Sequence, residues 1–152
     1  MLPDDLPALP YGELAPAFDL PDRTGARVTR SQFRGRQILV LLFVPEAAVP
    51  ELRLSELDAQ RERLEWLETT ILVILPVPTS ALPVSQAPIR YLADPGLTVT
   101  RNFTPVMEER PLETVVVLDR YGAVEQRWLA PHLPSAQDVF ALVERLALSC
   151  SG

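Results

Sequence analysis

Few side chains in this sequence are of the types that carry out redox or metal chemistry. There is one cysteine, Cys150, and one histidine, His132. A single cysteine excludes an intramolecular disulfide, a Cys-x-x-Cys redox pair and a cysteine-based zinc site, and a single histidine excludes a histidine cluster. We therefore expect neither a metal nor a cofactor.

The cysteine and the histidine each allow more than one interpretation. Cys150 follows the last turn of a predicted helix, where it is an incidental thiol, a partner in an intermolecular disulfide, or a redox-active group. His132 lies in the segment APHLPS before that helix, and it either titrates near neutral pH or occupies a loop. We favour an incidental thiol and a structural histidine, because neither has a chemical partner at a fixed spacing.

Paired carboxylates and an off-face tryptophan are the other candidates. Asp4 with Asp5, and Glu108 with Glu109, could do acid-base work or bind a hard cation, but polar or proline-rich flanks favour solvated surface. Trp66 falls away from the leucine face of its predicted helix, so it either marks a partner surface or packs under a neighbouring loop.

The elements that must position these residues follow from the apolar runs. Three nearly continuous runs predict strands that are covered on both faces: residues 38–44, 70–75 and 114–118. A shorter strand is predicted at 89–92, and residues 123–129 are expected to return from a turn at 119–122 as a hairpin partner. A further hairpin is predicted in 16–30, around a turn at 22–25.

Two helices complete the prediction. Leucines at helical spacing predict one amphipathic helix over residues 51–68, and Ser135 with Asp138 three residues later predicts the start of a C-terminal helix. The strand, helix, strand order implies a parallel pair with a right-handed crossover. We expect an α/β fold, a thioredoxin-like three-layer α/β/α sandwich with a mixed sheet of about five strands, helices on both faces and an N-terminal hairpin.

The chain is expected to form one domain. Residues 1–15 carry several prolines and are interpreted as an N-terminal arm, residues 16–149 as a single thioredoxin-like domain, and residues 150–152 as a C-terminal tail. The sequence contains no internal repeat and no linker between domains.

The stretch GELAPAFDLPDRTGARVTRSQFRGRQILVLLFVP resembles the opening of the peroxiredoxins, also called the alkyl hydroperoxide reductase and thiol-specific antioxidant family. The later pieces YLADPG and TVVVLDRYGAV are similar to the Asp-Pro turn and the strand with hairpin of that family. The resemblance extends from Gly12 to Val124. It implies a thioredoxin-like fold and, in its members, reduction of peroxides by a cysteine thiolate at the start of a helix.

The resemblance fails at the reactive positions. In the family a proline ends the strand, a Thr or Ser follows at a fixed spacing, and the peroxide-reducing cysteine comes three residues after that. Here the proline is Pro45, but Val49 stands at the hydroxyl position and Leu52 at the cysteine position. The family arginine that lowers the thiol pKa aligns with Glu113, whose carboxylate would repel a thiolate.

These departures set the expected function. We expect a redox-inactive peroxiredoxin-like protein that acts by protein binding, as a homo-oligomer or as an accessory subunit. One alternative is a divergent thiol peroxidase or oxidoreductase that uses Cys150, and another is small-molecule binding in the emptied peroxide pocket, which Val49 and Leu52 would make more apolar.

Charge and hydropathy restrict the partners and the compartment. The net charge is −6 and the fourteen basic residues, all arginine, are scattered, so we expect no binding to nucleic acid. The longest apolar run is much shorter than the roughly 20 residues that span a bilayer, so no membrane insertion is expected. The start MLPDDLPALP lacks the features of a secretory signal, which predicts a cytoplasmic protein.

Overall fold

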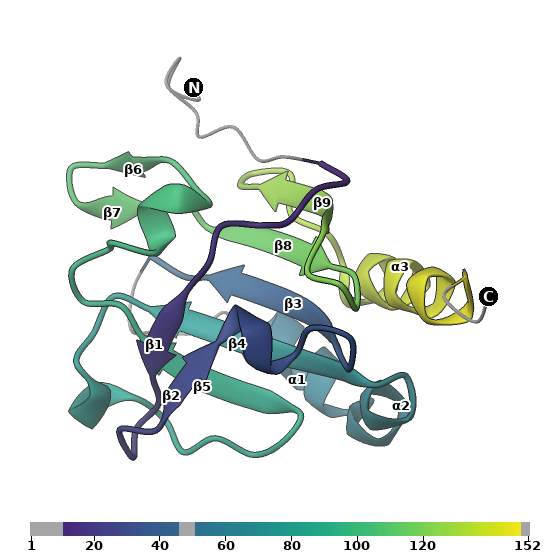
Figure 1. The fold of residues 1–152 in the computed structure, drawn as a ribbon. Coiled ribbons are helices and arrows are strands. Elements are labelled where there is room, and N and C mark those ends of the chain that lie inside the picture. Colours follow the sequence, from purple (N-terminus) through teal and green to yellow (C-terminus); the bar gives the residue numbers. More distant parts are fainter. Residues whose placement is uncertain (1–10, 46–50, 150–152) are drawn as a thin grey trace.

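A computed structural model describes residues 11–45 and 51–149, and side chains in the second range from Leu54 onward. Its centre is a five-stranded mixed sheet (Figure 1). The strands lie in the order β5 (Ile89–Ala93), β4 (Thr69–Leu75), β3 (Ile38–Phe43), β8 (Thr114–Leu118) and β9 (Val124–Leu129). β3, β4 and β5 are parallel, whereas β8 is antiparallel to both of its neighbours. The predicted α/β class, mixed sheet and parallel strand pair are confirmed.

The sheet separates two clusters of buried apolar side chains, because successive residues of a strand point to opposite faces. Along β3, Val40 and Leu42 belong to one cluster, and Leu41 and Phe43 belong to the other. All six residues of β3 are buried. This explains why the strand has no polar residue and why its apolar run was a reliable signal in the sequence.

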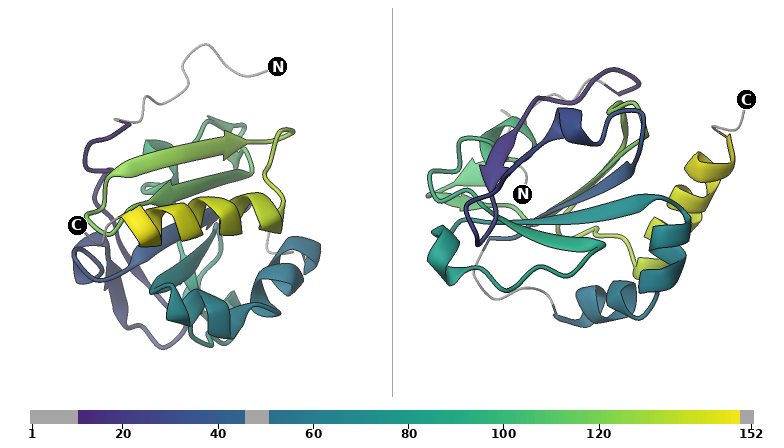
Figure 2. Two further views of the ribbon diagram at one scale, coloured as in Figure 1. Left: turned by 90° about the vertical axis from the view of Figure 1, so that its right-hand side faces the viewer. Right: turned by 60° about the horizontal axis from the view of Figure 1, so that its bottom comes forward.

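Three α-helices cover one face of the sheet: α1 (Glu51–Asp58), α2 (Arg61–Trp66) and α3 (Ala136–Ser149) (Figure 2). The N-terminus of α3 has the predicted capping box, in which Asp138 N–H donates to the Ser135 hydroxyl and Ser135 N–H donates to the Asp138 carboxylate. Both bonds satisfy backbone or side-chain groups at the first turn, so the predicted start of this helix is confirmed.

The prediction of one continuous helix over 51–68 is wrong. The chain breaks between α1 and α2 at Gln60, which has φ −108° and ψ 26° and whose N–H donates to the Leu57 carbonyl three residues back. Leu57 and Leu64 are both fully buried on either side of the break. The leucine spacing does not mark this break, because residues seven apart, such as Leu57 and Leu64, also share one face of a continuous helix.

The opposite face carries a layer without α-helix among the described residues. It consists of the predicted hairpin, β1 (Asp19–Pro21) with β2 (Arg27–Thr29), and of the 3-10 helices η1 (Arg30–Gln32) and η3 (Thr100–Asn102). We expected helices on both faces of the sheet. Among the described residues one face carries α-helices, and the other carries only single 3-10 turns. A third 3-10 turn, η2 (Thr79–Ala81), lies in the proline-rich connection between β4 and β5.

A second small hairpin, β6 (Val106–Met107) with β7 (Arg110–Pro111), was not predicted. Its two turn residues, Glu108 and Glu109, have φ of 52° and 60°. Tight hairpin turns of this kind normally carry Asn-Gly or Asp-Gly, and that sequence signal is missing here.

Residues 11–15 lie along the start of β9. Gly12 N–H donates to the Val124 carbonyl, Val124 N–H donates to the Glu13 carbonyl, and Ala15 N–H donates to the Gly122 carbonyl, each at 2.9 Å. The predicted arm over residues 1–15 thus has its last part bonded to the sheet, and residues 1–10 lie outside the described residues.

Candidate functional site

The positions singled out in the sequence gather at the carboxyl end of β3. Phe43, the last residue of β3, pairs with Thr114, the first residue of β8. The two strands are antiparallel. Pro45, which comes shortly after Phe43, and Glu113, which comes directly before Thr114, therefore lie at the same end of the sheet. The structure therefore brings together two of the residues that the motif comparison marked.

The remaining predicted site residues are only partly described. Leu52 is the second residue of α1, so its backbone is in the first helical turn, as the family pattern requires. Its side chain is outside the described part of the structure, and so are Val49 and Cys150. The helix that leads to Cys150 ends at Ser149, near the C-terminus in Figure 1, whereas β3 points to the opposite side of the molecule.

Two buried threonine hydroxyls occupy the end of β8 next to Glu113. Thr104 and Thr114 are fully buried, and their hydroxyls are hydrogen-bonded to each other. Both hydroxyls also lie within bonding distance of the Leu112 carbonyl, at 3.0 Å and 2.8 Å. Two protons cannot fill three bonds, so one hydroxyl donates to the carbonyl while the other donates to its neighbour. These hydroxyls are engaged within the protein.

Aromatic packing closes the site from the hairpin side. The rings of Phe43 and Phe103 stack with centroids 5.1 Å apart and an interplanar angle of 26°. The Phe103 carbonyl accepts a hydrogen bond of 2.9 Å from Nη1 of Arg127, which projects from β9. Sequence reasoning did not single out Arg127, because Glu125 and Gln126 precede it in β9 and an arginine in such a polar stretch carries no signal.

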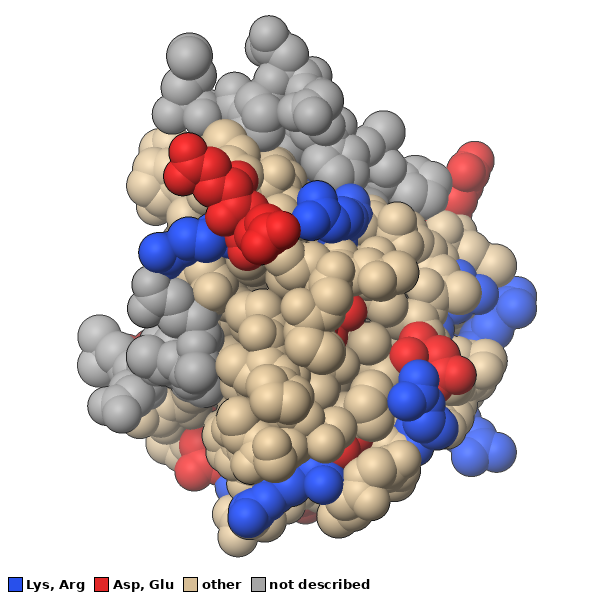
Figure 3. Space-filling model, turned by 90° about the vertical axis from the view of Figure 1, so that its left-hand side faces the viewer, with Lys and Arg blue, Asp and Glu red and all other residues tan. Residues whose placement is uncertain are grey.

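The loops at the carboxyl end of the sheet carry few charged residues. The connection after β4, residues 76–88, contains no Asp, Glu or Arg, and neither do residues 95–100 and 103–107. Val84 is 66% exposed and Met107 46% exposed. Figure 3 shows a broad area in which acidic and basic side chains are sparse, bordered by charged patches.

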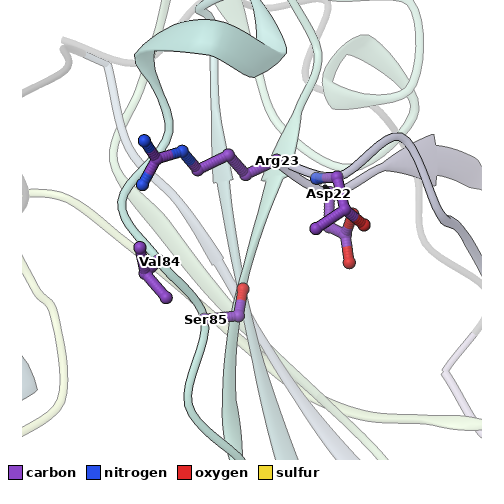
Figure 4. A pocket seen from close by; sticks show the side chains of 5 residues that line it. Asp22, Arg23, Val84 and Ser85 are labelled. Carbon is purple, nitrogen blue, oxygen red and sulfur yellow. Dashed lines mark hydrogen bonds between the residues drawn. The ribbon is translucent and has the colours of Figure 1, made fainter.

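A hollow of about 430 Å³ lies beside this surface rather than at Pro45 and Glu113 (Figure 4). It is lined by residues of the β1–β2 turn and of the loop before β5: Asp22, Arg23, Thr24, Val84 and Ser85. The Ser85 hydroxyl accepts the Tyr91 N–H of the edge strand β5 at 3.0 Å. The Asp22 carboxylate accepts hydrogen bonds from Thr24 and Ala26 of its own turn and from Arg90 of β5, so it is engaged within the protein.

The other candidates occupy exposed positions. His132 is exposed in the loop before α3, and its backbone N–H donates to the Leu129 carbonyl at 2.8 Å. Glu108 and Glu109 are exposed at the tip of the β6–β7 hairpin, and Asp4 and Asp5 lie outside the described residues. Within residues 11–45 and 51–149 no group of three or more metal-ligating side chains is found.

The model of the AhpC/TSA family matches residues 11–127, which is most of the described chain and includes Pro45 and Glu113. The chain belongs to the AhpC/TSA family. None of the curated protein sequences matches it significantly. The family assignment confirms the resemblance on which the site positions were chosen.

Solved peroxiredoxin structures share the fold of this AhpC/TSA member. The reduced 2-Cys peroxiredoxin of Plasmodium vivax superimposes with a TM-score of 0.77 at 15% identity, covering 91% of this chain and 97% of that one. The mitochondrial 2-Cys peroxiredoxin of Plasmodium falciparum gives 0.75 at 16% identity, covering 94% and 98%. Plasmodium yoelii Prx1a, modified at its N-terminus and described as an artifactual octamer, gives 0.72 at 18% identity, covering 92% and 91%.

No helix among the described residues of this AhpC/TSA chain is both long and apolar enough to cross a membrane. The family model covers four strands of the five-stranded sheet and most of β9, and α3 comes after the matched residues. The fold is therefore that of the peroxiredoxins, and the sequence holds a single cysteine, Cys150.

Proposed function

We propose that this AhpC/TSA chain is a redox-inactive peroxiredoxin-like protein that acts by binding other protein, either as a homo-oligomer or as an accessory subunit of an assembly. The observation that carries the proposal is Leu52 in the first turn of α1, where the family has its cysteine. A hydrocarbon side chain has no electron pair with which to attack a peroxide O–O bond.

The surroundings of that position support the same conclusion. Glu113 replaces the family arginine, and a carboxylate would raise the pKa of a nearby thiol rather than lower it. The hydroxyls of Thr104 and Thr114 bond to each other and to the Leu112 carbonyl, so neither replaces the hydroxyl that Val49 lacks.

The sparsely charged surface formed by the loops at the carboxyl end of the sheet is the binding face that we propose. The cores of protein interfaces are depleted in charged residues, and these loops carry few charges and expose the apolar side chains of Val84 and Met107. A cytoplasmic location is part of the proposal.

The first test is a peroxidase assay. Purified wild-type protein and Cys150→Ser are incubated with hydrogen peroxide or an organic hydroperoxide and a dithiol reductant, and peroxide consumption is followed. We expect both proteins to match the rate without protein. Consumption by the wild type that Cys150→Ser abolishes would instead establish a divergent thiol peroxidase that uses Cys150.

The second test addresses binding. Tagged wild-type protein and the variant Val84→Glu/Met107→Glu are isolated from the native cells, and the proteins that accompany each are compared by mass spectrometry. A charge in the centre of an apolar contact costs affinity, so a partner present with the wild type is expected to be lost from the variant. Identical accompanying proteins would argue against this face.

A further inference from the structure

Trp66 and Leu148 are large apolar side chains at the surface of the helical layer. Trp66, at the end of α2, is 74% exposed, and Leu148, near the end of α3, is 68% exposed. Exposed tryptophan is enriched at the energetic centres of protein interfaces. Neither side chain is needed to cover the core, because α2 and α3 bury Leu64, Val139 and Val143 there.

An ion pair places these two side chains on neighbouring parts of the two helices. Arg63 of α2 bonds through Nε to Glu144 Oε1 of α3 at 2.9 Å, and through Nη2 to the same oxygen. β3 and β4 are parallel, so the chain through α1 and α2 returns against the direction of β3. α3 also runs against β3, since it ends near the C-terminus on the side opposite to the one to which β3 points (Figure 1). Figure 2 shows α2 and α3 one beside the other.

Because the two helices run the same way, positions beyond the ion pair stay at equal height. Trp66 is three residues after Arg63 and Leu148 four residues after Glu144, which is one helical turn in each case. Trp66 and Leu148 therefore flank the ion pair on one face. We call this surface, made of Trp66 and Leu148 with the charges beside them, the helical face.

The charges of the helical face are arranged with opposite sign on its two sides. Glu62 lies four residues before Trp66 and so on the same side of α2, while Arg145 lies three residues before Leu148 on the same side of α3. Both are exposed, and neither forms an ion pair with another described residue. Across the face the order is thus anion, indole, internal ion pair, leucine, cation.

This order is complementary to itself. A two-fold axis parallel to the two helices and passing through the Arg63–Glu144 pair exchanges the left and right sides of the face while keeping heights unchanged. Trp66 of one copy then meets Leu148 of the other, and Glu62 meets Arg145, twice each. We infer that the helical face binds the same face of a second copy of this chain, with α2 of each copy packed on α3 of its partner.

The size of the face sets the strength of this dimer. α3 has 14 residues and α2 has 6, and at about 1.5 Å per residue and about 10 Å of width for each helix the contact covers roughly 300 Å² per copy. Stable interfaces bury about 800 Å² per partner. The dimer is therefore weak and depends on concentration.

This dimer specifies the homo-oligomer that the proposed function allows, but it does not rest on the loss of peroxidase activity, because it uses the helical layer and not the carboxyl end of the sheet. An active peroxidase would leave it standing, and a monomeric chain would leave the proposed loss of activity standing. The two proposals therefore fail in separate experiments.

The test is analytical ultracentrifugation of the purified full chain over a series of micromolar concentrations. We compare the wild type with Trp66→Ser/Leu148→Ser, Glu62→Arg, Arg145→Glu and the double reversal Glu62→Arg/Arg145→Glu. We expect a wild-type monomer–dimer equilibrium, a dissociation constant raised at least about tenfold in the serine variant and in each single reversal, and recovery in the double reversal.

Tyr11→Ser is the matched control, because Tyr11 is an exposed aromatic residue in the segment that pairs with the start of β9, outside the helical layer. It should leave the equilibrium unchanged. All substituted residues are exposed, and circular dichroism checks that each variant is folded. A wild type that stays monomeric, a serine variant that associates as the wild type does, or a double reversal no stronger than the single ones would overturn the inference.

Discussion

The carboxylate of Asp22 organises the turn between β1 and β2. It accepts hydrogen bonds from the Thr24 hydroxyl at 2.6 Å, Thr24 N–H at 2.9 Å and Ala26 N–H at 3.1 Å, and Arg90 lies 3.3 Å from its second oxygen. The Thr24 hydroxyl is the main cause that holds the pKa of Asp22 below its ordinary value of 3.8, and partial burial opposes this effect.

Asp22→Asn should therefore destabilise the protein in a pH-dependent way. A carboxyl with a lowered pKa in the folded state stabilises that state above its unfolded pKa, near 4, and the stabilisation is lost as the pH falls through the folded pKa. At neutral pH we expect the free energy of unfolding to fall by roughly 1–2 kcal/mol. Urea denaturation of wild type and variant between pH 7 and pH 2 should show the difference shrinking below about pH 4.

Asp19→Asn is the control for that measurement, because Asp19 is 59% exposed and pairs with Arg27 at the surface. Such a pair contributes at most about 1 kcal/mol. A difference for Asp22→Asn that stayed constant down to pH 2 would show that the carboxylate charge is not what stabilises the turn.

The shared carbonyl of Leu112 predicts an unusual coupling between Thr104 and Thr114. If either threonine becomes valine, the remaining hydroxyl can still donate to that carbonyl. Each single change should therefore lower the free energy of unfolding by about 1 kcal/mol or less. The double change removes both donors, and we expect it to cost about 1 kcal/mol more than the sum. Chemical denaturation of the four proteins gives this cycle, and strictly additive costs would contradict the shared bond.

At the residue scale the substitutions at the reactive positions stay predictions, and the sequence did not predict their surroundings. Leu52 and Glu113 could be placed because each has a fixed spacing from a recognisable strand. The bond between Thr104 and Thr114 depends on the β6–β7 hairpin folding back between them. A contact set by such a hairpin leaves no spacing rule in the sequence.

The turn of the β6–β7 hairpin is strained. Glu108 and Glu109 both have the left-handed φ that favours glycine or asparagine. Relieving this strain outweighs the greater freedom of glycine in the unfolded chain, so Glu109→Gly should raise the free energy of unfolding by about 0.5–1 kcal/mol. Thermal unfolding followed by circular dichroism measures the change.

Glu65→Gly provides the matched comparison, because Glu65 is an exposed residue inside α2 with an ordinary helical environment. The same replacement should there lower stability by about 1 kcal/mol. Two changes of the same sign would mean that the backbone at Glu109 is not the source of the strain.

At the element scale the strands were predictable and the connections were less so. The runs that form β3, β4 and β8 are apolar because helices or the hairpin layer cover both of their faces. The break at Gln60 left no glycine or proline in the sequence to mark it. Leucine periodicity cannot reveal it either, because Leu57 and Leu64 are seven residues apart and would lie on one face of an unbroken helix as well.

At the scale of the whole molecule, the sheet couples its two outer layers. β3 contributes Val40 and Leu42 to the cluster under the helices, and Leu41 and Phe43 to the cluster under the hairpin. Neither cluster can lose its packing without exposing one side of the same strand. The domain should therefore unfold as one cooperative unit.

Leu20→Ala tests this coupling from one layer to the other. Leu20, in β1, is buried against the sheet on the hairpin side, whereas Trp128, in β9, packs against the helix-side cluster. In a Trp66→Phe background Trp128 is the only tryptophan, so its fluorescence reports the helix side. Loss of the Leu20 side chain should lower the free energy of unfolding by about 2–4 kcal/mol. The urea midpoint should fall by the same amount whether it is followed by Trp128 fluorescence or by far-UV circular dichroism. A fluorescence midpoint that did not move would mean that the two layers unfold separately, even though they share β3.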